Sequence, residues 1–402
     1  MARTVIVHVG APKTGTSFVQ DLLFNARDDL ARSGVLYPAA RFDAHFLAAL
    51  DLMQLTWGGL EREAVGAWDR LAAEVRAWSG TAIVSHEILA TASRAHVARA
   101  LESLSSGATE IHVVLSARDL VRQIPAEWQE NVKHRRTTTY AEFLADLRDP
   151  SRQQGVASWF WGVQEVPDIL DRWGGTLPRE HVHLVTVPPA GSPPDLLWQR
   201  FAGVLGLDPE QLPLDEVRTN PSLGVAEAAV VRRLNEQIAE LVPNHHYRAL
   251  VREALVHRGL SLDRRSARLS VPPDVWDWAT ELSRQWVTDL ALRGYDVVGD
   301  LDDLLPVEAL PFVDPDDIGP VELGETALRA LTLMTIEGAR LRDREVELMR
   351  DIDELIAKLD AAHSTPIYKA KERFVAKAST SRVAGAGLSV YRRLRGRNSR
   401  ST

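Results

Sequence analysis

The stretch that decides the fold covers residues 5–17 and reads Val5-Ile6-Val7-His8-Val9-Gly10-Ala11-Pro12-Lys13-Thr14-Gly15-Thr16-Ser17. Its first five residues are apolar except for His8, which is typical of a parallel strand buried on both faces. Apolar residues then recur at helical spacing between Phe18 and Leu30. The stretch is therefore predicted to form a buried strand, a tight turn and the start of a helix.

The turn has the chemistry of a phosphate-binding loop. Glycines allow the backbone to approach a ligand closely, a lysine adds a positive charge, and a helix N-terminus offers free amides. The predicted ligands of a phosphate group are Gly10, Ala11, Pro12, Lys13, Thr14, Gly15, Thr16 and Ser17. In a Walker A loop the lysine directly follows the last glycine, whereas here Lys13 precedes Gly15 by two positions. This order disfavours an ATPase or GTPase.

The pattern Pro12-Lys13-Thr14-Gly15-Thr16-Ser17 resembles the 5′-phosphosulfate loop of the sulfotransferases that use 3′-phosphoadenosine 5′-phosphosulfate (PAPS). Arg118 follows the predicted strand 111–116 and matches the arginine of that family's 3′-phosphate segment. The family's serine eight residues later is replaced by Ala126, and Arg218 matches a late basic loop only loosely. The resemblance covers residues 1–220 and implies PAPS as co-substrate, with no metal ion.

The resemblance also implies roles in sulfuryl transfer. Lys13 is expected to stabilise the negative charge that develops on the departing nucleotide. The base that takes a proton from the acceptor is expected to be His86, Glu87 or Asp21, with His45 or a water molecule as further alternatives. His86 follows the predicted strand 81–85, as in the cytosolic branch of the family, and Glu87 is its neighbour. Asp21 matches the catalytic glutamate of the heparan sulfotransferase branch, and these alternatives stay open.

Composition excludes several functional classes. The chain has 402 residues, 45% of them hydrophobic, and no cysteine, so it has no disulfides and no thiolate chemistry. No spacing of histidines and carboxylates indicates a metal site, and no apolar run is long enough to span a membrane. We expect a cytoplasmic protein. Residues 1–362 carry a net charge of −17, which argues against nucleic acid as a partner.

The alternation of strand and helix patterns predicts an α/β fold, a three-layer domain with a central parallel sheet. Predicted strands cover residues 4–9, 34–38, 81–85, 111–116 and 182–187. Predicted helices cover residues 61–78, 92–104, 119–133, 140–148, 194–205, 225–241 and 245–257. We expect a catalytic domain over residues 1–300, a Pro- and Asp-rich linker over 301–322, a coiled-coil-like helix over 323–362 and a basic tail over 363–402.

The two C-terminal segments suggest partners. The helix carries a heptad-like seam of Leu331, Met334, Gly338, Leu341, Glu345, Leu348, Ile352, Leu355 and Leu359, which suits a homodimer or packing on the catalytic domain. Residues 363–402 carry a net charge of +9 with interleaved apolar side chains. Such a tail is either solvated and disordered or lies peripherally on the anionic inner face of a membrane.

The favoured function is a PAPS-dependent sulfotransferase acting on a hydroxyl or amine of a glycan, glycolipid or secondary metabolite. Trp159 and Trp161 are candidates for contact with the acceptor, because aromatic faces suit sugar rings or flat aglycones. One alternative is a P-loop kinase that phosphorylates a small molecule with MgATP. Another is a non-catalytic scaffold that binds partners or membranes through its C-terminus, an alternative that Ala126 keeps open.

Overall fold

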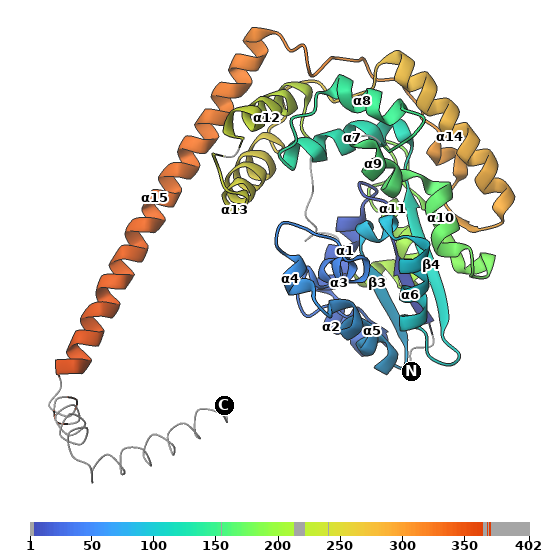
Figure 1. Cartoon of the computed structure of the whole chain (residues 1–402), viewed down its shortest axis with the longest axis horizontal. Helices are drawn as coiled ribbons and strands as arrows, with labels where there is room; N and C mark the ends of the chain where they lie inside the picture. Colours follow the sequence, from blue (N-terminus) through green and yellow to red (C-terminus); the bar gives the residue numbers. More distant parts are fainter. Residues whose placement is uncertain are drawn as a thin grey trace. The chain divides into compact units, whose positions relative to one another are not determined.

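A computed structural model describes residues 4–153, 155–212, 222–239, 241–364, 368 and 370. Six strands form one parallel sheet in the order β2-β3-β1-β4-β5-β6, and helices surround it (Figure 1). The strands are β1 (Thr4–His8), β2 (Val35–Leu36), β3 (Thr81–Ser85), β4 (Glu110–Ala117), β5 (Val182–Thr186) and β6 (Asp296–Val298). The predicted α/β class with a central parallel sheet is confirmed.

The helices of the first half are α1 (Thr16–Asn25), α2 (Arg27–Arg32), α3 (Ala44–Met53), α4 (Glu61–Ala64), α5 (Ala67–Ala77), α6 (Arg94–Leu104), α7 (Leu120–Lys133), α8 (Tyr140–Arg148), α9 (Ala157–Gln164) and α10 (Val166–Gly174). Those that follow are α11 (Leu196–Leu205), α12 (Val225–Ile238), α13 (Asn244–Tyr247), the π-helix η4 (Arg248–Leu260), α14 (Pro273–Arg293) and α15 (Pro320–Ser364). Short 3₁₀ helices include η1 (Glu87–Thr91), η2 (Arg179–His181), η3 (Pro209–Gln211) and η5 (Leu301–Leu304).

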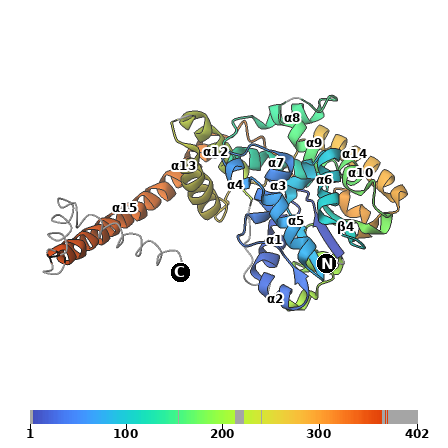
Figure 2. The ribbon, with the colours of Figure 1, turned by 60° about the horizontal axis from the view of Figure 1, so that its bottom comes forward.

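Both faces of the sheet are buried, which explains the unbroken apolar composition of its strands. On one face, Ile6, Ile83 and Val114 pack with side chains of α1 and α11. Residues of the opposite parity, such as Val5 and Leu115, are also buried, and α10 contacts β4 on that side. Figure 2 shows α3, α5 and α6 beside one another, as their contacts require. The result is a layer of strands between two layers of helices.

Helix α7 lies between the end of strand β4 and three helices that come later in the chain. It begins directly after β4 and contacts α12, α14 and η4. Asp119 caps its N-terminus by accepting a hydrogen bond of 2.9 Å from the amide of Arg122. Because α7 starts at the carboxyl edge of the sheet, its side chains can reach the loop that follows β1.

The chain divides into two compact units, one up to Leu331 and one from Thr332 onward. The segment that the sequence suggested as a linker contains η5 and belongs to the first unit, where the carbonyl of Pro311 accepts a hydrogen bond of 3.0 Å from Ser270. The first turns of α15 also belong to that unit. There Arg329 pairs at 3.1 Å with Glu227, whose side chain is fully buried. From Thr332 to Ser364 the helix exposes most of its large apolar side chains, including Leu348 and Leu355.

Several element boundaries differ from the sequence expectations. The pattern over residues 61–78 splits into α4 and α5, and residues 245–257 form α13 and η4 rather than one α-helix. Helices α3, α9, α10 and α14 and strand β6 were not predicted. Helix α14 begins at a proline and carries three tryptophans, which have modest helix propensity, so its helical pattern was weak. The long C-terminal helix expected over 323–362 is present as α15.

Candidate functional site

The predicted phosphate loop, residues 10–17, joins the carboxyl end of β1 to the N-terminus of α1. Gly10 has φ of +121°, and a Cβ there would lie 2.9 Å from the carbonyl oxygen of Glu87, so only glycine fits. Within the described residues, the backbone amides of Thr14, Gly15, Thr16 and Ser17 find no hydrogen-bond acceptor. These amides and the N-terminus of α1 offer an anion the donors that it needs.

The hydroxyls of the loop have different tasks. Thr14 is fully buried and donates a hydrogen bond of 2.6 Å to the carbonyl of Ala11, so it holds the loop together. Its Oγ1 also lies 2.5 Å from the hydroxyl of Ser116 on β4. Ser17 is exposed at the start of α1. We therefore expect Ser17 to face a ligand and Thr14 to keep a structural role.

Lys13 projects from the loop toward α7. Its Nζ donates a hydrogen bond of 2.5 Å to Oε2 of Glu130. Burial raises the pKa of Glu130, but Lys13, His134 and Lys133 outweigh this effect and hold it well below its usual range. Glu130 is therefore an ionised carboxylate, and it forms an ion pair with Lys13.

One face of α7 lies along the loop. Gln123 and Gln164 both donate hydrogen bonds to the carbonyl of Pro12, the second at 3.2 Å. Gln164 also donates a hydrogen bond of 3.0 Å to Glu127, which is 4% exposed. Burial raises the pKa of Glu127 to about 7, although the charges of Lys13 and Arg118 act in the opposite direction. Glu127 thus lies within electrostatic reach of both predicted anion-binding cations.

Arg118 follows β4, the strand beside β1 in the sheet, so both predicted anion sites lie at one edge. Its guanidinium donates one hydrogen bond of 2.8 Å to the carbonyl of Arg122. The Nε atom of Arg118 is buried without a partner among the described residues. Burial lowers the pKa of Arg118 to about 10. An arginine with a buried and unused donor is suited to a phosphate group.

His86 directly follows β3 and lies half-buried beside the loop. The amide of Ile88 donates a hydrogen bond of 3.2 Å to its Nδ1. This bond uses the lone pair of Nδ1, so the neutral ring carries its proton on Nε2. Burial lowers the pKa of His86, and the charge of Glu87 opposes this effect. In this tautomer His86 is a hydrogen-bond donor at Nε2 and not a proton acceptor.

Glu87 is the carboxylate nearest to this histidine in sequence. Gln20 of α1 donates a hydrogen bond of 2.8 Å to its Oε2. Burial raises the pKa of Glu87, but His86, Gln20 and Lys13 more than offset this, and its pKa lies below the ordinary value. Asp21 belongs to the same neighbourhood, because the charges of Glu87 and Asp21 both contribute to the raised pKa of the buried Tyr37 phenol. All three candidate bases therefore lie near the phosphate loop.

Half-buried aromatic rings lead away from His86. Its ring centroid lies 5.1 Å from that of Phe46, which lies 5.6 Å from Trp57, which in turn lies 5.9 Å from Trp159. Trp161 does not belong to this series, because it is buried and its Nε1 bonds to the carbonyl of Leu147. Of the two tryptophans suggested for acceptor contact, only Trp159 has an exposed portion near the candidate site.

His45 is a structural residue. The amide of Ser85 donates a hydrogen bond of 3.1 Å to its Nδ1, and Nε2 lies 3.1 Å from the carbonyl of Pro38. Burial lowers the pKa of His45 to about 4. Both ring nitrogens are thus occupied, and the ring is not available to an acceptor.

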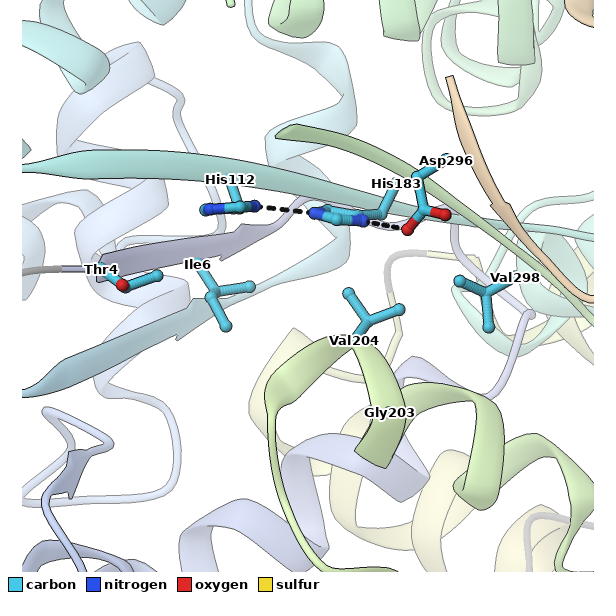
Figure 3. A pocket seen from close by; sticks show the side chains of 8 residues that line it. All are labelled: Thr4, Ile6, His112, His183, Gly203, Val204, Asp296 and Val298. Carbon is cyan, nitrogen blue, oxygen red and sulfur yellow. Dashed lines mark hydrogen bonds and ion pairs between the residues drawn. The ribbon is translucent and has the colours of Figure 1, made fainter. Parts of the chain in front are cut away.

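A half-open cavity of about 340 Å³ lies away from this edge. It is lined by residues near the amino ends of β1, β4, β5 and β6 and by α11. Figure 3 shows His112 hydrogen-bonded to His183 at 2.8 Å, and His183 hydrogen-bonded to Asp296 at 2.6 Å. Ligands of open parallel sheets bind at the carboxyl ends of the strands, so this cavity is not the predicted nucleotide site.

The comparisons with known proteins give one distant likeness. The crystal structure of a sulfotransferase from Alicyclobacillus acidocaldarius is similar to 62% of this chain and to 96% of its own, with 19% identity and a TM-score of 0.38. No family model matches the sequence, and no curated protein matches it.

Several residues of this site were not predicted from the sequence. Glu127, Glu130, Gln20 and Gln164 lie on helices, and only the fold brings them to the loop. Arg218 and residues 371–402 of the basic tail lie outside the described residues. In the described part of the chain no cluster of three histidines or carboxylates could hold a metal ion. No helix described here is long and apolar enough to cross a membrane.

Proposed function

We propose that the protein is a sulfotransferase that moves a sulfuryl group from PAPS to a hydroxyl or amine of its acceptor. The observation that carries the proposal is the pair of anion-binding elements at adjacent strand ends. These are the loop with its free amides and Lys13 after β1, and Arg118 with its unused Nε after β4. A nucleotide with phosphate groups at both ends of its ribose needs two such sites.

The proposed reaction assigns a task to three side chains. The acceptor oxygen or nitrogen bonds to sulfur while the bond from sulfur to the 5′-phosphate oxygen breaks. Lys13 balances the negative charge that develops on that oxygen. The acceptor's proton goes to a base, and the neutral tautomer of His86 supports Glu87 in that role. His86 would instead donate from Nε2 to an oxygen of the sulfuryl group. Asp21 remains a further candidate for the base.

The acceptor is proposed to be a glycan, glycolipid or secondary metabolite. The ring series from Phe46 to Trp159 supports this, because half-buried aromatic faces stack on sugar rings and flat aglycones.

Calorimetry with adenosine 3′,5′-bisphosphate and with MgATP tests the proposal. We expect the bisphosphate to bind the wild-type protein and to bind at least tenfold more weakly to Lys13→Met and to Arg118→Met. Arg284→Met is the matched control, since Arg284 is an exposed cation on α14. Preference for MgATP would instead indicate a kinase. Binding of neither nucleotide would leave a non-catalytic scaffold.

A further inference from the structure

Four basic side chains converge on the carboxylate of Glu130. Besides the contact to Lys13 at 2.5 Å, its oxygens lie 3.2 Å from His134 Nε2, 3.7 Å from a terminal nitrogen of Arg252 and 3.9 Å from Lys133 Nζ. We call Lys13, Lys133, His134 and Arg252 the Glu130 cluster. Lys13, Lys133 and Arg252 are cations in their protonated forms, and one carboxylate cannot neutralise three cations. The cluster therefore keeps a surplus of positive charge beside the phosphate loop.

Lys133 is the most unusual member of the cluster. Its side chain is 6% exposed, and 3.9 Å from its only carboxylate contact is too far for a hydrogen bond. No other described residue accepts a hydrogen bond from its Nζ. Burial lowers the pKa of Lys133 to about 8, and Lys13 and Arg252 lower it further against the pull of Glu130. A nearly buried ammonium without an acceptor is costly unless an anion completes its surroundings.

Arg252 repeats this pattern from a different element. It lies on η4, and its Nε is buried without a partner among the described residues. Its contact with Glu130 at 3.7 Å is longer than a hydrogen bond. Two cations from two helices, α7 and η4, thus approach the same carboxylate without a hydrogen bond to it.

The direction of α7 places Lys133 at the end of the helix that lies away from Arg118, while Lys13 and Lys133 both lie beside Oε2 of Glu130. The helix begins two residues after Arg118 and ends at Lys133. Between them lies Glu127, and the charges of both Arg118 and Lys13 oppose the rise of its pKa through burial. At a rise of about 1.5 Å per residue, Lys133 lies about 9 Å beyond Glu127 along the axis. A nucleotide that extends from Lys13 toward Arg118 therefore runs along α7 away from Lys133 and leaves this cation beside the position of the phosphosulfate.

We propose that Lys133 and Arg252 form an anion subsite for the acceptor, which carries a carboxylate, sulfate or phosphate group near the position that is sulfated. The proposal rests on the proposed function, because it takes Lys13 to mark the position of the phosphosulfate. His134 lies at the exposed end of the cluster and can add a further donor.

Calorimetric titration with inorganic sulfate, on the protein saturated with adenosine 3′,5′-bisphosphate, tests the subsite. We expect wild-type protein to bind sulfate, and Lys133→Met and Arg252→Met each to bind it at least tenfold more weakly. Arg248→Met is the matched control, because Arg248 is an exposed arginine at the start of the same η4. The bisphosphate itself should bind all four proteins equally. Thermal unfolding verifies that the variants are folded.

Other results would overturn the subsite. Sulfate that binds equally to wild type and Lys133→Met would occupy the sulfuryl position rather than the cluster. A tenfold loss of bisphosphate affinity in Lys133→Met would assign the cluster to the nucleotide, which leaves the proposed function intact. If wild type binds no bisphosphate, the proposed function fails, and sulfate titration of the nucleotide-free protein then decides the anion site alone. Loss of sulfate in Lys133→Met would support that site, and no binding to wild type would refute it.

Discussion

The Nζ of Lys13 donates a hydrogen bond of 2.5 Å to Oε2 of Glu130, across 117 residues of sequence. The lysine predicted to bind the nucleotide is thus held by a carboxylate of its own chain. Any anion that enters the phosphate loop must compete with Glu130 for this lysine and must also approach a negative charge.

The first prediction follows from this competition. Glu130→Gln should bind adenosine 3′,5′-bisphosphate about tenfold more tightly than wild type, equivalent to about 1.4 kcal/mol. The amide removes the repulsion and releases Lys13. Calorimetry measures the change, and Glu281→Gln, which alters an exposed ion pair on α14, should leave the affinity unchanged. Weaker binding to Glu130→Gln would mean that the carboxylate positions Lys13 for the nucleotide.

The second prediction separates the two neighbouring candidates for the base. Glu87→Gln should lower kcat/KM for sulfuryl transfer by about 10²- to 10⁴-fold, the usual contribution of a general base. His86→Gln should stay within tenfold of wild type, because its side-chain amide keeps a donor near the position of Nε2. Release of adenosine 3′,5′-bisphosphate from PAPS measures turnover. Glu110→Gln, at an exposed position where β4 starts, is the control. The reverse order of the two effects would restore His86 as the base.

The third prediction concerns acid. Burial lowers the pKa of His8 and of His45 to about 4, from an ordinary value near 6.5 in the unfolded chain. Between pH 6.5 and 4 the unfolded chain binds protons that the folded chain does not bind, so the free energy of unfolding falls as the pH falls. At pH 4, each ring lowers the free energy of unfolding by up to about 3 kcal/mol relative to its value at neutral pH.

Thermal unfolding at pH 7.5, 6.5, 5.5 and 4.5 measures this loss. The decline in Tm should be smaller in His45→Gln, which has one titrating ring fewer, and unchanged in His246→Gln, since His246 is exposed. A Tm that is level down to pH 4.5 would contradict the prediction.

The fourth prediction tests the homodimer suggested by the seam of α15. Leu348 and Leu355 are 46% and 64% exposed, so a second copy of the helix could bury them. The double variant Leu348→Lys, Leu355→Lys should turn a dimer into a monomer in light scattering coupled to gel filtration. Met349→Lys, an exposed change outside the seam, should remain dimeric. A monomeric wild type would exclude this mode of association.

The sequence predicts the core of the fold because its signals are local. The apolar run over residues 5–9, the glycines at 10 and 15 and the apolar spacing that follows Ser17 specify a strand, a turn and a helix within 30 residues. The parallel sheet follows from the repeated alternation of such units. Strand β6 was missed because it has only three residues, the first of them Asp296, and no alternation is visible over so short a length.

The candidate site was only partly predictable, because its electrostatics depend on tertiary contacts. The roles of Glu127 and Glu130 follow from the docking of α7 against the loop, a contact that no local pattern encodes. The tautomer of His86 depends on the amide of Ile88, which points to the ring only because η1 turns directly after β3. Spacing can nominate a histidine as a base, but it cannot say which ring nitrogen has a free lone pair.

The ion pair between Arg329 and the fully buried Glu227 determines where the chain can be shortened without loss of a buried contact. Expression of residues 1–300 or 1–322 would remove Arg329 and leave a buried carboxylate without its cation, which typically costs several kcal/mol. A cut just after Leu331, at the boundary between the two compact units, keeps the pair. Shortened versions made for crystallisation or for assays should therefore retain the first three turns of α15.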